Sequence, residues 1–184
     1  EGVRHRMKQS LLFDLDDTLI HCNKYFFLIL DRFADAMLDW YGGYGITREQ
    51  IVNKHTEIDI AGVMNVGFQS DHFPQSFVDT HRYFHHVTGR AVSPLEEQQL
   101  WRLGNSVYEL EVEPYPFMEE TLDALAGEGH QLHLYTGGDA VIQRRKIAQL
   151  KLERFFGDRI YVRQHKNTEA LESIISTGDF ERDN

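Results

Sequence analysis

An apolar run that ends in closely spaced aspartates constrains this chain more than any other segment. Residues 11–20 read Leu-Leu-Phe-Asp-Leu-Asp-Asp-Thr-Leu-Ile. The apolar lead-in predicts a buried strand over residues 9–14. Because side chains alternate along a strand, Asp14 and Asp16 are expected to point to the same side. Two carboxylates so close together repel each other unless a cation lies near them, and the pattern is therefore typical of a site for a divalent metal and phosphate.

The rest of the sequence separates into a helical block and an alternating block. Residues 23–111 carry apolar side chains at helical spacing, and Thr47 and Ser93 each begin a capping box. From Pro114 onward, helices and strands alternate, which predicts a parallel sheet with right-handed crossovers. The elements expected there are helix 117–126, strand 130–135, helix 139–150, strand 159–163 and helix 168–176. The predicted fold is therefore α/β: a Rossmann-like, three-layer parallel-sheet core with an inserted α-helical bundle.

Composition and charge exclude several classes of protein. The chain has 184 residues and a net charge of -10, so it lacks the basic face that nucleic-acid binding needs. No apolar stretch approaches the roughly 18 residues of a membrane span, and residues 1–6 do not resemble a signal peptide. Met7 is the expected natural start, with residues 1–6 left over from an expression vector. The single cysteine, Cys22, fits a reducing compartment, and a cytoplasmic protein without nucleic-acid or membrane partners is expected.

The aspartate segment resembles motif I of the haloacid dehalogenase (HAD) superfamily, most of whose members are phosphatases. The resemblance implies that Asp14 is the nucleophile and Asp16 the general acid/base. It also implies a Mg²⁺ site formed by the Asp14 carboxylate and the Asp16 main-chain carbonyl. The position of the helical block, directly after this motif, is similar to that of type 1 HAD caps. The implied organisation is a split core domain, residues 7–20 and 112–184, with a cap over residues 21–111.

Two further positions fit the phosphate-binding motifs of this superfamily. Thr136 ends a predicted strand and precedes two glycines, so its hydroxyl and the Gly137 amide are candidate phosphate donors, together with the amides of Leu15 and Asp16. Lys166 follows the last predicted strand and resembles the motif III lysine, although Asn167 replaces the proline common after it. Lys146 is the competing candidate, and because it lies inside a helix we expect it outside the site.

The end of the chain departs from the family pattern. A Gly-Asp-x-x-x-Asp string includes Asp179 and Asp183, but only 12 residues separate Lys166 from Asp179, and they read as one helix. No strand fits between them, so this string is not expected to be motif IV. We expect the chain to stop before the fourth core strand, which would leave residues 11–14 as an exposed sheet edge. Association through that edge and weak Mg²⁺ binding would follow; the oligomeric state is otherwise open.

These features predict an enzyme, a phosphoric monoester hydrolase that acts on a small phosphorylated metabolite. The reaction implied by the resemblance is Mg²⁺-dependent and passes through an aspartyl-phosphate on Asp14. Asp16 argues against a dehalogenase, which needs no acid at that place. Two alternatives stay open: a phosphomutase of the same superfamily, and a catalytically inactive HAD-like binding module.

Overall fold

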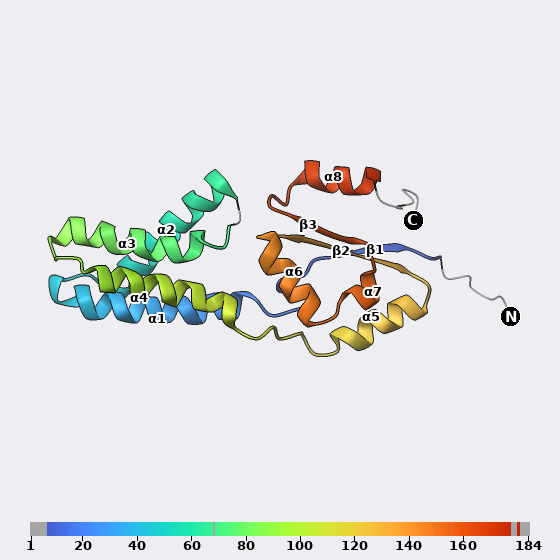
Figure 1. Cartoon of the computed structure of the whole chain (residues 1–184), viewed down its shortest axis with the longest axis horizontal. Coiled ribbons are helices and arrows are strands. Elements are labelled where there is room, and N and C mark those ends of the chain that lie inside the picture. Colours follow the sequence, from blue (N-terminus) through green and yellow to red (C-terminus); the bar gives the residue numbers. More distant parts are fainter. Residues whose placement is uncertain (1–6, 68, 178–179, 181–184) are drawn as a thin grey trace. The chain divides into compact units, whose positions relative to one another are not determined.

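The computed structural model describes residues 7–67, 69–177 and 180, and Figure 1 shows its helices and strands. The strands are β1 (Ser10–Phe13), β2 (Gln131–Gly137) and β3 (Ile160–Arg163). The helices are α1 (Asn23–Tyr41), α2 (Arg48–Val66), α3 (His72–Thr88), α4 (Pro94–Asn105), α5 (Met118–Gly127), α6 (Ala140–Gln149), α7 (Glu153–Phe156) and α8 (Thr168–Thr177). Two short 3₁₀ helices, Gly42–Tyr44 and Ser106–Glu109, follow α1 and α4.

The chain divides into two compact units. The helical unit is Cys22–Glu111, and the sheet unit consists of the described residues before and after it. The chain passes between the units twice, and the two connecting segments are hydrogen-bonded to each other within the sheet unit. The His21 amide donates to the Glu113 carbonyl at 2.9 Å, and the Tyr115 amide donates to the Leu19 carbonyl at 2.9 Å.

The described residues of the sheet unit form a three-stranded parallel sheet in the order β1-β2-β3. Leu11 is paired with Leu132, and Thr136 with Val162, so the carboxyl ends of the three strands lie at one edge of the sheet. β1 pairs with β2 on one side and is an edge strand of the described sheet, with Leu12 40% exposed. The α/β fold with a parallel sheet is thus confirmed, while Asp179 and Asp183 lie outside the described residues.

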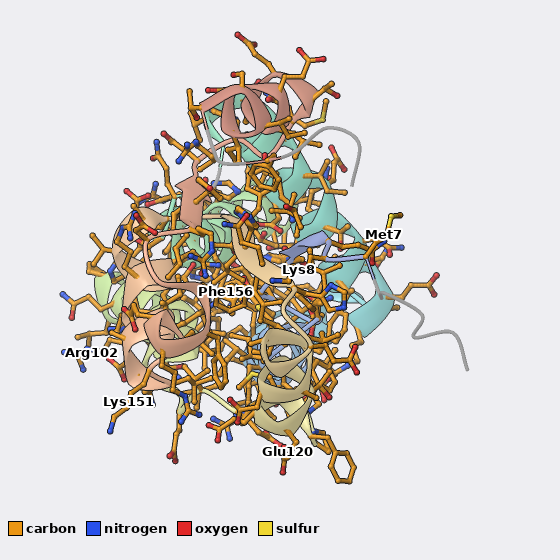
Figure 2. All side chains as sticks on the ribbon, turned by 90° about the vertical axis from the view of Figure 1, so that its right-hand side faces the viewer. Met7, Lys8, Arg102, Glu120, Lys151 and Phe156 are labelled. Carbon is orange, nitrogen blue, oxygen red and sulfur yellow. The ribbon has the colours of Figure 1, made fainter. Side chains whose placement is uncertain are left out.

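Helices cover both faces of this sheet, with α5, α6 and α7 on one face and α8 on the other (Figure 1). The larger core lies under α5–α7, where Leu132 and Leu134 of β2 pack with Phe156 of α7. Figure 2 shows Phe156 inside this unit, while Glu120 and Lys151 lie at its surface. Burial of each large apolar side chain contributes about 1.5–3 kcal/mol, and this packing fixes the direction in which the strand ends point.

The helical unit has its own aromatic core. Phe33 of α1 is fully buried and stacks on Phe77 of α3 with ring centroids 4.1 Å apart. The predicted capping boxes at Thr47 and Ser93 are both present, at the starts of α2 and α4. Close packing of α3 against α4 depends on Gly104, since a Cβ there would lie 2.5 Å from the Cα of Pro74. The unit therefore folds around contacts made within Cys22–Glu111.

The sequence patterns missed some short elements. α7 spans only Glu153–Phe156, too few residues to show a helical period. Helix α3 begins at His72, so Pro74 lies in its first turn, where proline is well tolerated. The strand expected over residues 130–135 extends to Gly137, since Thr136 and Gly137 pair with β3.

Candidate active site

Asp14, the residue after β1, is paired with a lysine from the far end of the sequence. Lys166 Nζ lies 2.6 Å from Asp14 Oδ1. The Thr18 hydroxyl donates to the other carboxylate oxygen, Oδ2, at 3.3 Å. Lys166 follows β3, and Asn167 holds the next turn in place by accepting the Ala170 amide at 2.9 Å at the start of α8. The structure therefore brings Lys166 to Asp14, as expected for a residue that follows another strand of the same parallel sheet.

Asp16 is held by two side chains of α6. Lys146 Nζ donates to Asp16 Oδ1 at 2.9 Å, and Gln143 Nε2 donates to Asp16 Oδ2 at 2.9 Å. The expectation that Lys146 lies outside the site is therefore wrong. Lys146 and Gln143 are three residues apart and share one face of α6. That face is directed at the loop after β1, which the helical position of Lys146 alone did not reveal.

Thr136 joins this network through the same glutamine. Its hydroxyl oxygen accepts from Gln143 Nε2 at 2.8 Å, and its proton makes a long contact of 3.4 Å with the Gly137 carbonyl. A hydroxyl that accepts a hydrogen bond in this way keeps its own proton available for an anion. The predicted role of Thr136 as a phosphate donor is compatible with this arrangement.

The two glycines after Thr136 make room for the side chains of the site. A Cβ on Gly137 would lie 3.0 Å from the Cβ of Lys166, and one on Gly138 would lie 3.0 Å from the Cγ of Gln143. Gly138 also has a φ of +142°, which L side chains rarely adopt. The Thr-Gly-Gly sequence thus allows both Lys166 and Gln143 to approach the end of β2.

Tyr135 lies beneath Lys166. The Lys166 ammonium is 5.0 Å from the centre of the Tyr135 ring, within the range of a cation–π interaction. Tyr135 is 5% exposed, and its hydroxyl has no hydrogen-bond partner among the described residues. This contact could not be predicted from the sequence, because a tyrosine within an apolar strand is also typical of a core position.

The loop between Asp14 and Ile20 is anchored at its centre by Leu15. The Leu15 side chain is fully buried, and its carbonyl accepts the amides of Leu19 at 2.9 Å and Ile20 at 3.2 Å. Asp17 has a φ of 56°, a left-handed conformation that aspartate tolerates better than most residues. The chain therefore turns sharply directly after Asp16, so that both motif aspartates lie at the carboxyl end of β1.

Each carboxylate of the pair has its own lysine, so the four side chains of Asp14, Asp16, Lys146 and Lys166 balance in charge. The oxygen donors at the strand end fit Mg²⁺ in kind, because Mg²⁺ is usually bound by one or two carboxylates with several waters and a substrate phosphate. No group of three or more His, Cys, Asp or Glu side chains suited to a metal occurs in the part of the chain that the structure describes. The donors present therefore suit a metal shared with the substrate.

A parallel α/β sheet with an inserted helical unit and an Asp-x-Asp loop after its first strand defines a Rossmann-like α/β protein with a candidate active site at its strand ends. The sequence model of the haloacid dehalogenase-like hydrolases matches residues 9–173. The chain therefore belongs to the haloacid dehalogenase-like hydrolase family. A comparison with curated protein sequences gave no match.

Solved structures of HAD-like proteins share this fold. A haloacid dehalogenase-like family hydrolase from Xanthomonas campestris superimposes with a TM-score of 0.78 at 21% identity, covering 94% of this chain and 69% of that protein. A HAD-hydrolase from Bacillus subtilis, bound to magnesium, gives a TM-score of 0.55 at 18% identity, over 95% of this chain and 74% of that one. A β-phosphoglucomutase-like protein from Thermotoga maritima gives a TM-score of 0.53 at 17% identity, over 92% of this chain and 70% of that one. None of the helices in the described ranges is long and apolar enough to cross a membrane.

Proposed function

We propose that this protein is a Mg²⁺-dependent phosphatase that hydrolyses a small phosphorylated metabolite through an aspartyl-phosphate. The observation that carries the proposal is the pairing of Asp14 with Lys166 and of Asp16 with Lys146 at the carboxyl end of one parallel sheet. A phosphoryl group brings negative charge, and lysines already directed at this point stabilise it without large rearrangement. The same site class accommodates the phosphomutase alternative, which differs in the acceptor of the phosphoryl group.

In the proposed reaction, an Asp14 carboxylate oxygen attacks phosphorus. The P–O bond to the leaving group breaks as the new bond forms, and Asp16, which carries a proton in the substrate complex, donates it to the departing oxygen. Asp16, now a carboxylate, then accepts a proton from water as that water attacks the aspartyl-phosphate. The second step releases inorganic phosphate and returns Asp14 to its free carboxylate, so protons and bonds balance over the two steps.

Other groups of the chain bind the phosphoryl oxygens. Lys166 and the Thr136 hydroxyl are the side-chain donors, and the amides of Leu15, Asp16 and Gly137 are the main-chain candidates. The Asp14 carboxylate and the Asp16 carbonyl would hold Mg²⁺. When bound, Mg²⁺ neutralises charge on the phosphate and polarises the phosphorus toward attack.

The helical unit is proposed to act as the cap, which excludes water from the reaction and selects the leaving group. Its separate aromatic core supports this role, because a unit with its own core keeps its fold while the substrate is exchanged. The partner of the site is then a small phosphorylated molecule.

The test is Asp14→Asn, which keeps the shape of the side chain and removes the nucleophilic charge. Hydrolysis of 4-nitrophenyl phosphate with Mg²⁺ is expected to fall by at least about 1,000-fold, and chelation of Mg²⁺ should abolish it in the wild type. Asp123→Asn, the same change at an exposed position of α5, is the matched control and should keep full activity. Acid quenching during turnover should trap a phosphoryl group on the peptide that contains Asp14. Substantial turnover by Asp14→Asn would refute the mechanism, and transfer of the phosphoryl group to a sugar instead of water would favour the mutase.

A further inference from the structure

We propose that Gln143 is a positioning residue that sets the geometry of the general acid and of the phosphate-binding hydroxyl together. The inference rests on the proposed function for the roles of Asp16 and Thr136. The contacts themselves are independent of it. Gln143 contributes one amide nitrogen that joins two residues 120 positions apart in the sequence, Asp16 and Thr136.

The two hydrogen bonds use the two protons of one amide group. Gln143 Nε2 lies 2.9 Å from Asp16 Oδ2 and 2.8 Å from Thr136 Oγ1. An amide NH₂ has two donors in a fixed plane, so satisfying both fixes the angle between the two acceptors. Gln143 is only 3% exposed, and water therefore competes little for these bonds.

The backbone holds the glutamine rigidly in this place. The Gln143 amide donates to the Asp139 carbonyl at 2.9 Å, which makes it part of the first turn of α6. Asp139 in turn caps the helix by accepting the amides of Val141 and Ile142. On the other side, Gly138 leaves the space that the Gln143 side chain occupies, since a Cβ there would lie 3.0 Å from Cγ.

Lys146 completes the arrangement around Asp16. With Lys146 on Oδ1 and Gln143 on Oδ2, the carboxylate plane is fixed at both oxygens. Each oxygen keeps a further lone pair, and one of these two lone pairs carries the single catalytic proton. The orientation of that proton toward the leaving oxygen is thus decided by α6, and a proton donor must be within hydrogen-bond reach and correctly directed to act.

Gln143→Leu tests the proposal, with two esters of nearly the same shape. Loss of leaving-group protonation slows phenyl phosphate, whose phenolate is a poor leaving group, more than 4-nitrophenyl phosphate, whose phenolate needs little help. Gln143→Leu is therefore expected to lower the ratio of kcat/KM for phenyl phosphate to that for 4-nitrophenyl phosphate by about tenfold. Gln149→Leu, the same change at an exposed position of the same helix, should leave both values and their ratio unchanged.

A purely structural role gives a different result. Equal losses on both esters, or a loss that follows a fall in thermal stability, would overturn the positioning role. The side-chain ¹⁵N–¹H signals of Gln143, assigned by their disappearance in Gln143→Leu, give a readout that needs no turnover. They should shift in Asp16→Ala, and unchanged signals would refute the contact. A wild-type protein without phosphatase activity would refute the proposed function, while the amide signals would still decide the contact.

Discussion

His55 makes the stability of the helical unit dependent on pH. It is 3% exposed and lies among the rings of Phe33, Phe73 and Phe77, with centroids 5.1–5.8 Å away. The Ser76 hydroxyl donates to the Phe73 carbonyl at 2.5 Å, so it accepts from His55 Nε2 at 2.9 Å. The buried imidazole is therefore neutral with its proton on Nε2, and a second proton would enter the aromatic core.

Burial lowers the pKa of His55 from 6.5 to about 4, with a smaller contribution from nearby His72. In the unfolded chain the His55 imidazole is half protonated near pH 6.5, whereas in the folded protein it is half protonated only at about pH 4. The unfolded state therefore binds more protons across this window, and the free energy of unfolding falls as pH falls. The contribution of neutral His55 to the free energy of unfolding is fully present above about pH 6.5 and is lost progressively toward pH 4. From pH 7.5 to pH 5.0 the loss is about 2 kcal/mol, at 1.36 kcal/mol per pKa unit.

His55→Gln isolates this effect, because its amide can still donate to Ser76 but does not titrate. The free energy of unfolding in urea should fall by about 2 kcal/mol more in the wild type than in His55→Gln between pH 7.5 and pH 5.0. The assay is tryptophan fluorescence, since both tryptophans of the chain, Trp40 and Trp101, belong to the helical unit. Other groups that titrate in this range cancel in the comparison. Parallel pH dependences of the two proteins would refute the buried neutral state of His55.

Two further changes test the packing and the sheet edge. Gly104→Ala should destabilise the helical unit by about 1–3 kcal/mol in the same urea assay, because its methyl group would meet the backbone of Pro74. Gly43→Ala is the control, since a Cβ at Gly43 would have no atom within 4 Å. Equal losses of stability in the two variants would contradict the reasoning. Leu12→Lys, on the edge strand β1, should reduce self-association in sedimentation velocity experiments. A wild type that is monomeric at all concentrations would show that this edge does not mediate association.

The parts of the fold and of the site that follow from sequence are those fixed by local geometry or by strand order. Thr47 and Ser93 begin capping boxes because the partner lies only three residues away. Asp14 and Lys166 follow β1 and β3, the two strands that flank β2 in one parallel sheet, and the carboxyl ends of all three strands lie at the same end of that sheet. The pairing of these two side chains is therefore predictable although they are 152 positions apart.

The contacts that α6 makes with Asp16 cannot be predicted from the sequence in the same way. Which face of a helix meets a loop depends on how the helix packs on the sheet, and that packing is decided by the buried residues of several elements. Lys146 and Gln143 are typical of an exposed helix face in composition. Their position beside Asp16 follows from the burial of Ile147, the residue after Lys146, in the core, because that burial sets how α6 is rotated on the sheet.

The hydrogen bonds between His21 and Glu113 and between Leu19 and Tyr115 have a consequence for how such a protein diverges. They hold the first and last residues of the inserted unit next to each other. The gap in the sheet unit that the insertion has to bridge is therefore as short as the gap bridged by a hairpin loop. Replacement of everything between those two connecting segments leaves the distance that the insertion has to bridge unchanged. Under the proposed role of the inserted unit as a cap, a new substrate preference arises in its helices while the aspartates and lysines at the strand ends keep their geometry.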